Sequence, residues 1–362
     1  MAQSRDLPAL ALVERAAFTA DRISPASWRR LMHSETAQVF VLPDAADSPA
    51  GAAVLLYRRR SSVARLYSIA VDGSHCGHGG GSALLQECID AARTRGCSVL
   101  RLETREDNLA AQAMFHRFGF EPLAPKLGYY ADGATALRFE KPLWSPGAAG
   151  AFVVQAPFHA QTLDFSCGAC ALLMAMAALR PGTAMDRTAE IRIWREATTV
   201  FMAAGHGGCG PYGLALAAAH RGFQVEVHAP AGTRLFVDSV RDPRKKEVIE
   251  LVEADFRSEL RQLPNVTLSA RQVSAEAVAD WLRGGRVPVV LISLWRLHAE
   301  KGPHWVVVTG FDGAVFRILD PAAHPEPGQD PGISVAVDEF RRITRYGRRR
   351  HTGAVVLSEP SA

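Results

Sequence analysis

The sequence of 362 residues has no long hydrophobic run. Its longest uninterrupted apolar stretch, Ala169–Leu179, has 11 residues, whereas a membrane-spanning helix needs about 20. The first residues also lack the order of charged, apolar and small residues that marks a secretory signal peptide. We therefore expect no membrane partner and a cytoplasmic location.

The sequence also has no marked excess of one charge. It contains 41 Lys and Arg residues against 37 Asp and Glu residues, a net charge of +4. The residues before position 145 include 17 basic and 15 acidic ones, so each part of the chain carries +2. Domains that bind nucleic acid usually show a strong local excess of basic residues. We expect peptides, proteins or small molecules as partners, and no nucleic acid.

Cysteine is scarce, and its spacing is informative. Only Cys167 and Cys170 lie close together among the six cysteines, which stand at positions 76, 88, 97, 167, 170 and 209. A disulfide framework is not expected in a long, core-rich chain, and a single close pair does not complete a four-ligand zinc site. We expect no metal. The Cys-Gly-Ala-Cys spacing leaves open a thiol redox function.

The length predicts two domains, because one domain usually has roughly 100–200 residues. A stretch of small residues with one Pro and two Gly predicts a linker at 144–151 between domains at 1–143 and 152–362. The first domain alternates helical and strand patterns and is expected to be α/β with a mostly antiparallel sheet. The second has its helices first and its strands last, which is an α+β arrangement.

A glycine-rich turn stands between a predicted strand that ends at Val71 and a predicted helix that continues to about Arg95. It includes Gly77, Gly79, Gly80 and Gly81. Glycines let the backbone approach a ligand closely, and free N–H groups at a helix start bind anions. The turn therefore predicts a diphosphate site, with a turn that binds no ligand as the alternative.

A second segment, Asn108 to Phe120, has a helix that Asn108 can cap and Gly119 can end. Together with the turn, it resembles the GNAT superfamily of N-acetyltransferases, in the branch that acetylates ribosomal-protein alanine. The resemblance covers about residues 5–143. Residues 76–81 match the superfamily's Arg/Gln-x-x-Gly-x-Gly/Ala signature except at the first position, where Cys76 stands.

The resemblance implies a GNAT fold and acetyl-CoA as co-substrate. It implies that Glu103 is the base that deprotonates the acceptor amine. The family often has an acid Tyr where this sequence has Phe115, and the loss of a general acid costs about 10²–10⁴-fold in rate. The residues implied to bind acetyl-CoA are Ala70, Val71, Gly77, His78, Gly79, Gly80, Gly81, Ser82 and Asn108.

A different chemistry is indicated in the second half. Cys167 lies where a predicted loop becomes a helix, a place that favours the nucleophilic thiolate. Gln161 precedes it by six residues and can offer an N–H to an oxyanion. His304 begins one predicted strand and Asp320 ends the next, so the two side chains are expected to be neighbours that supply a base and its orienting carboxylate.

These residues resemble the double-glycine-leader cysteine peptidases of bacteriocin processing, which have a papain-like fold. The resemblance spans roughly 151–357 and implies Cys167 as nucleophile, His304 as base, Asp320 as orienter and Gln161 as oxyanion donor. The gap from Cys to His is longer than is usual in that family. A charged helix predicted at 245–263 accounts for much of the extra length.

The leading hypothesis is a bifunctional enzyme, an acetyl-CoA-dependent N-acetyltransferase joined to a cysteine peptidase, with a peptide or protein as substrate. Cleavage would expose an α-amine that acetylation then caps. One alternative keeps the second domain as a catalytically silent peptide-binding module. Another is a thiol redox protein that uses Cys167 and Cys170.

Overall fold

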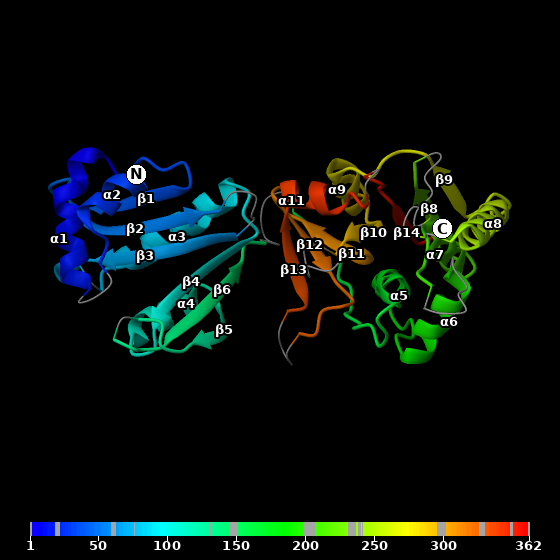
Figure 1. Ribbon diagram of the computed structural model, residues 1–362, viewed down its shortest axis with the longest axis horizontal. Helices are drawn as coiled ribbons and strands as arrows, with labels where there is room; N and C mark the ends of the chain where they lie inside the picture. Colours follow the sequence, from blue (N-terminus) through cyan, green and yellow to red (C-terminus); the bar gives the residue numbers. More distant parts are fainter. Residues whose placement is uncertain are drawn as a thin grey trace. The chain divides into compact units, whose positions relative to one another are not determined.

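The chain divides into two compact units, Met1–Trp144 and Ser145–Ala362 (Figure 1). The computed structural model describes residues 2–18, 22–58, 63–75, 77–130, 132–144, 151–198, 207–230, 237, 240, 242–294, 302–325, 330–347 and 350–360. Most of the expected linker at 144–151 lies outside these residues, as does Cys76.

Within its described residues, the first unit has a six-stranded sheet and four α-helices. Along the chain these are α1 Leu7–Ala17, α2 Pro25–Met32, β1 Ala37–Pro43, β2 Pro49–Tyr57, β3 Val63–Val71, α3 Gly80–Thr94, β4 Val99–Arg105, α4 Leu109–Arg117, β5 Glu121–Lys126 and β6 Ala136–Pro142. The strand order is β1-β2-β3-β4-β6-β5. Only β3 and β4 pair in parallel, which confirms the expected mostly antiparallel α/β domain.

The two parallel strands separate before they end. β3 pairs with β4 only where Val63–Leu66 faces Val99–Leu102, although β3 continues to Val71. At Tyr67 the pairing of β3 with β2 skips one residue, and such a bulge bends a strand. Figure 1 shows the resulting divergence of β4, β6 and β5 from β1, β2 and β3. From Ser68 to Val71, β3 therefore pairs with β2 but not with β4.

Helix α3 fixes the glycine-rich turn against the sheet. Its buried residues are Leu84, Leu85, Cys88, Ile89 and Ala92, a spacing that forms one apolar face of a helix. This face belongs to the same core as Phe115 and Phe139. The N-terminus of α3 is therefore held at the end of β3.

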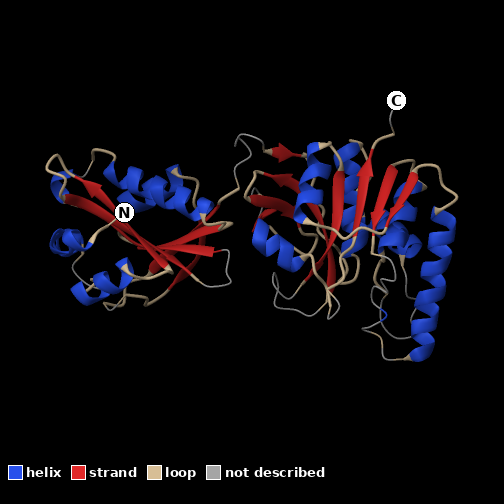
Figure 2. Cartoon of the chain, turned by 90° about the horizontal axis from the view of Figure 1, so that it is seen from above, coloured by secondary structure: helices blue, strands red, loops and turns tan. Residues whose placement is uncertain are grey.

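The second unit consists of an eight-stranded sheet with helices on both faces (Figure 2). Its elements are β7 Phe152–Val153, α5 Cys167–Leu179, α6 Arg187–Ala197, α7 Pro211–Ala219, β8 Gln224–His228, α8 Pro243–Leu260, β9 Val266–Ser269, α9 Ala275–Arg283, β10 Val287–Ser293, β11 Pro303–Phe311, β12 Val315–Leu319, β13 Gly332–Ala336, α11 Val337–Ile343 and β14 Ala354–Ser358. The order is β13-β12-β11-β10-β14-β8-β9, with β7 against β11.

Strand β10 shows why both faces are covered. Val289 and Leu291 belong to the core that includes α5 and α7, whereas Val290 and Ile292 belong to the core that includes α9 and α11. Alternate residues of a strand point to opposite faces, so a strand that is apolar at every position is buried on both. The sheet therefore divides the unit into two cores.

Helix α5 lies inside the first of these cores. Ten of its residues, from Gly168 to Ala177, are buried, and a helix that is apolar on all sides needs neighbours on all sides. It contacts β10, β11, α6 and α7. This burial gives Cys167, the first residue of α5, a fixed position.

Helix α6 ends at Ala197. The next residue, Thr198, is extended and bridges to Cys209, and β-branched residues favour extended backbone. The short strands β9 and β13 have no long alternating pattern, so the sequence does not predict them. Among the helices in the described ranges, none is long and apolar enough to cross a membrane.

Candidate functional site

The structure brings Cys167, His304 and Asp320 together in the second unit. His304 Nε2 lies 2.5 Å from Asp320 Oδ1, and the His304 ring is also hydrogen-bonded to the Cys167 side chain. Since Nε2 faces the carboxylate, Nδ1 is the nitrogen left for the thiol. This order of thiol, imidazole and carboxylate is the arrangement that activates a nucleophile.

The hairpin of β11 and β12 produces the contact between the imidazole and the carboxylate. His304 is the second residue of β11, and Asp320 directly follows β12. The antiparallel register pairs Val307 with Leu319, so the two side chains meet at the open end of the hairpin. Asp320 Oδ1 also accepts a hydrogen bond of 2.8 Å from the Ala322 N–H, which fixes the carboxylate.

Burial and hydrogen bonding act on His304 in opposite directions. The residue is 3% exposed and Asp320 is 0% exposed. Burial alone lowers the pKa of His304, but its hydrogen bonds to Asp320 and Cys167 outweigh that effect and raise the pKa to about 10. The site therefore favours the charged imidazolium at neutral pH, which stabilises a negative charge on the neighbouring sulfur.

Cys167 differs from the other cysteines of the described ranges in its exposure. It is partly exposed, whereas Cys88, Cys97, Cys170 and Cys209 are buried. Burial raises the pKa of Cys88 to about 12 and that of Cys97 to about 11, and it raises the pKa of Cys170 and of Cys209 still further. Cys167 is thus the thiol best placed to react.

Gln161 lies in the loop that leads to Cys167. Its backbone N–H donates a 2.8 Å hydrogen bond to the carbonyl of Pro321, the residue after Asp320. The Gln161 Oε1 atom is buried and has no hydrogen-bond partner among the described residues. An oxyanion is bound by the side-chain N–H and not by Oε1, so the oxyanion role of Gln161 stays a prediction.

Glu190 of α6 holds the same loop and was not predicted from the sequence. It is 0% exposed, and its carboxylate accepts hydrogen bonds from Thr162 N at 3.0 Å, Thr162 Oγ1 at 2.9 Å and Ser166 Oγ. The sequence contains one indication of this role, because Glu190 is an acidic residue on the apolar face of α6. It stands three residues before the buried Ile193 and seven residues before the buried Ala197.

In the first unit, the glycine-rich turn has the backbone geometry that an anion needs. Gly77 and Gly79 have φ of 80° and 83°, which glycine adopts most easily. Gly79 is the N-cap of α3, and its carbonyl accepts from Ala83 N. This is the first hydrogen bond of the helix. The backbone N–H groups of Gly80 to Ser82 come before it in the chain and therefore have no partner within the helix. They fit a diphosphate.

Open space adjoins this turn. A Cβ atom added to Gly77 or Gly79 would meet nothing within 4 Å, whereas one added to Gly81 would lie 3.5 Å from Met114 Sδ and 3.9 Å from Val71 Cγ2. The end of β3, with Ala70 and Val71, thus borders the turn. Asn108 Oδ1 accepts from Ala111 N at 3.1 Å, so its observed role is to cap α4, and its contact with a cofactor stays a prediction.

Glu103, the predicted base, is in an ion pair. Its Oε2 lies 2.9 Å from Arg65 Nε, and Arg65 Nη2 donates a 2.8 Å hydrogen bond to Tyr129 Oη. Burial lowers the pKa of Arg65, but the charge of Glu103 and the bond to Tyr129 outweigh it and raise the pKa. The guanidinium beside Glu103 neutralises its charge, and the role of Glu103 as a base stays a prediction.

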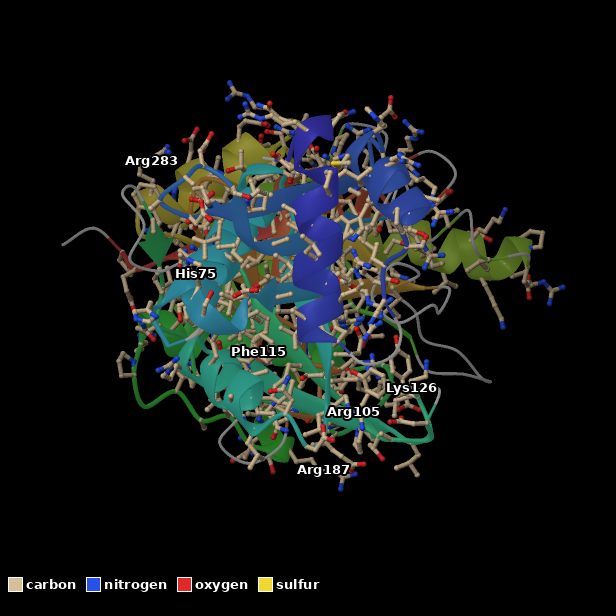
Figure 3. The ribbon with its side chains drawn as sticks, turned by 90° about the vertical axis from the view of Figure 1, so that its left-hand side faces the viewer. His75, Arg105, Phe115, Lys126, Arg187 and Arg283 are labelled. Carbon is tan, nitrogen blue, oxygen red and sulfur yellow. The ribbon has the colours of Figure 1, made fainter. Side chains whose placement is uncertain are left out.

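Phe115 lies in the core of the first unit, on α4 (Figure 3). It is 2% exposed, and its ring centroid is 5.8 Å from that of Phe120 and 5.9 Å from that of Phe139. It has no proton to donate. Two tyrosines that follow β5 each have a cation over the ring: Lys126 lies over Tyr129, and Arg105, also labelled in Figure 3, lies over Tyr130.

Comparisons with known proteins follow the same division of the chain. Residues 156–358 match the model of the Peptidase_C39 like family, and residues 8–120 match the model of the Acetyltransferase (GNAT) family. These matches confirm both expected resemblances, including a papain-like second half.

Two curated relatives are acetyltransferases. A [Ribosomal protein bS18]-alanine N-acetyltransferase of Escherichia coli (strain K12) is 40% identical over 67 residues, which is 18% of this chain and 45% of that protein. The N-alpha-acetyltransferase RimI of Mycobacterium tuberculosis (strain ATCC 25618 / H37Rv) is 35% identical over 82 residues, 22% of this chain and 50% of that protein. The chain thus spans about half the length of these curated relatives.

A crystal structure of the ribosomal-protein-S18-alanine N-acetyltransferase from Escherichia coli is 30% identical, with a TM-score of 0.36, over 40% of this chain and 93% of that one.

The family models account for both units of the fold. The chain belongs to the Peptidase_C39 like family, and its first unit is a GNAT acetyltransferase domain.

Proposed function

We propose that the chain is a bifunctional enzyme of the cytoplasm, with a cysteine peptidase in the domain at 152–362 and an acetyl-CoA-dependent N-acetyltransferase in the domain at 1–143. The observation that carries the proposal is the hydrogen-bonded set of Cys167, His304 and Asp320. The substrate is a peptide or a protein.

In the peptidase reaction, the Cys167 sulfur attacks a peptide carbonyl and forms a thioester. The imidazolium of His304 gives its proton to the departing amine, and water then hydrolyses the thioester. Asp320 orients the imidazole throughout. Gln161 supports the oxyanion with its side-chain N–H, and Glu190 keeps the loop from Thr162 to Ser166 in place.

In the transferase reaction, acetyl-CoA supplies the acetyl group when it is bound. The backbone N–H groups of residues 77–82 would hold its diphosphate, and Ala70 and Val71 would lie beside the acetyl group. Glu103 would remove a proton from the acceptor amine, whose nitrogen bonds to the acetyl carbon as the thioester bond breaks, and the released CoA thiolate would take a proton from solvent. The acceptor is proposed to be the N-terminus of a peptide or protein, as the name of the alanine N-acetyltransferase relative suggests.

The two reactions can follow one another. Hydrolysis of a peptide bond releases a new α-amine, and that amine is the chemical group which an N-acetyltransferase accepts. We propose that the second domain cuts and the first domain then caps the product, in this order.

The test uses synthetic peptides with a central Gly-Gly pair, and a separate peptide that starts with Ala. The full chain is incubated with each, with and without acetyl-CoA, and products are identified by mass spectrometry. Cleavage that is lost in Cys167→Ala, followed by acetylation of the new N-terminus, supports the proposal. Acetylation of uncleaved peptide alone, unchanged in Cys167→Ala, would instead favour a silent peptide-binding domain.

A further inference from the structure

A second group of side chains lies beneath the loop that leads to Cys167. His159, Cys170 and Glu190 each offer one ligand atom, and these atoms all lie within 4.8 Å of one another. Cys170 and Glu190 are 0% exposed, and the side chain of His159 is 14% exposed. The three residues come from the loop before α5, from α5 and from α6.

Glu190 presents a buried carboxylate to this group. Its oxygens accept hydrogen bonds from Thr162 N, Thr162 Oγ1 and Ser166 Oγ. Charges that are removed from water are normally paired with an opposite charge or coordinate a metal. The hydrogen bonds from Thr162 and Ser166 come from neutral groups, and a ring nitrogen of His159 lies beside the same carboxylate.

His159 presents an unsatisfied nitrogen to this carboxylate. Its Nε2 is buried and makes no hydrogen bond to any described residue, and it lies 3.7 Å from Glu190 Oε2. That separation is too long for a hydrogen bond. It is close to the distance between two ligands of one tetrahedral zinc ion, whose bonds to N and O are about 2.0–2.2 Å.

We propose that His159, Cys170 and Glu190 form a binding site for a divalent metal ion of the zinc class. The set of one nitrogen, one sulfur and one carboxylate oxygen suits zinc and its tetrahedral analogue cobalt. On binding, the thiol of Cys170 loses its proton to solvent, and the thiolate forms the metal–sulfur bond. A water molecule that enters past His159 completes the fourth position.

The ion would bind the carboxylate of Glu190 and satisfy the Nε2 atom of His159 in one step. It would also tie the loop that carries Gln161, and the first turn of α5, to α6. This inference is independent of the proposed peptidase activity, since it requires neither a reactive Cys167 nor a substrate.

The test is a spectroscopic titration of the full-length Cys167→Ser variant with Co²⁺ under reducing conditions. The substitution prevents metal binding by the thiol–imidazole pair of the peptidase site. One equivalent of Co²⁺ is expected to give a thiolate-to-cobalt charge-transfer band together with the strong visible bands of a tetrahedral site. Zn²⁺ is expected to displace both.

Added to this variant, Cys170→Ser should abolish the charge-transfer band, and His159→Ala should weaken Co²⁺ affinity at least tenfold. Cys209→Ser is the matched control, because Cys209 is also buried near Cys167 but lies outside the group, and it should leave the titration unchanged. Thermal melts show that each variant is folded. The absence of any band at micromolar Co²⁺, or a band that persists in Cys170→Ser, would overturn the proposal.

Discussion

Asp320 Oδ1 lies 2.5 Å from His304 Nε2, and neither side chain is more than 4% exposed. The same imidazole is hydrogen-bonded to Cys167. A buried carboxylate in this position holds the ring in one orientation and stabilises its positive charge. The contact therefore links the stability of the fold to the protonation of the proposed catalytic base.

The first prediction concerns pH. The folded protein raises the pKa of His304 from 6.5 to about 10, so between these values the folded state holds a proton that the unfolded state has released. This proton therefore makes a stabilising contribution to the free energy of unfolding. The contribution is complete below pH 6.5 and is lost as the pH rises to about 10. Urea denaturation across this range, followed by tryptophan fluorescence, measures the loss.

Asp320→Asn is the matched variant for this measurement. It removes the charge that raises the pKa of His304 and keeps the shape of the side chain. The decline in unfolding free energy between pH 6.5 and 10 should be clearly smaller in this variant. Equal declines in the two proteins would show that His304 is not the group responsible.

The second prediction concerns Glu190 as a positioning residue. In Glu190→Gln, the amide cannot accept all of the hydrogen bonds from Thr162 and Ser166. Loss of hydrogen bonds to a buried charge costs about 2 kcal/mol or more, and a shift of about 1 Å in a reacting group can cost about 10² in rate. We expect kcat on the Gly-Gly peptide to fall about 100-fold with little change in KM.

Glu253→Gln is the control for this effect. Glu253 is also a buried glutamate, but it lies on α8, and burial raises its pKa to about 7. One of its oxygens has no hydrogen-bond partner among the described residues, so the neutral amide should be tolerated. If both substitutions lowered kcat equally, the role assigned to Glu190 would be wrong.

The comparison of sequence and structure is most instructive at the peptidase site. Cys167, His304 and Asp320 could be predicted because each stands at the end of a recognisable helix or strand, and a short hairpin brings two of them together. Glu190 could not be placed in this way, because its contacts with Thr162 and Ser166 depend on how α6 packs against the loop. Sequence spacing carries no information on that packing.

A similar limit applies to the first unit. The glycine-rich turn and the helix cap at Asn108 follow from local rules, and both are observed. The ion pair of Glu103 with Arg65 depends on the register of β3 with β4 and on the loop that carries Tyr129. Neither the register nor the loop position is encoded in a short motif.

The third prediction concerns the diphosphate site at the start of α3. Ser82→Asp places a carboxylate among the N–H groups that are proposed to bind the diphosphate of acetyl-CoA. The affinity for CoA, measured by calorimetry, should fall at least tenfold through charge repulsion. The same carboxylate interacts favourably with the helix dipole, by about 0.3–1 kcal/mol, so the melting temperature should not fall.

Ser82→Ala is the control that separates the effect of the added charge on CoA affinity from the effect of losing the serine hydroxyl. Its CoA affinity should stay within about twofold of the parent chain, because the proposed contacts come from the backbone. Unchanged CoA affinity in Ser82→Asp would place the diphosphate elsewhere. A large loss in Ser82→Ala would assign the contact to the side chain.

The central claim is that His304 activates Cys167, and its most direct test needs no substrate. The full chain is treated with iodoacetamide at pH 7, and the labelled cysteines are quantified by peptide mass spectrometry over time. Among the cysteines that the structure describes, we expect rapid labelling of Cys167 alone, slowed at least tenfold in a folded His304→Gln variant, with the four buried thiols labelled slowly in both proteins. Equal rates at Cys167 in the two proteins, or faster labelling at one of the four buried cysteines, would contradict this claim.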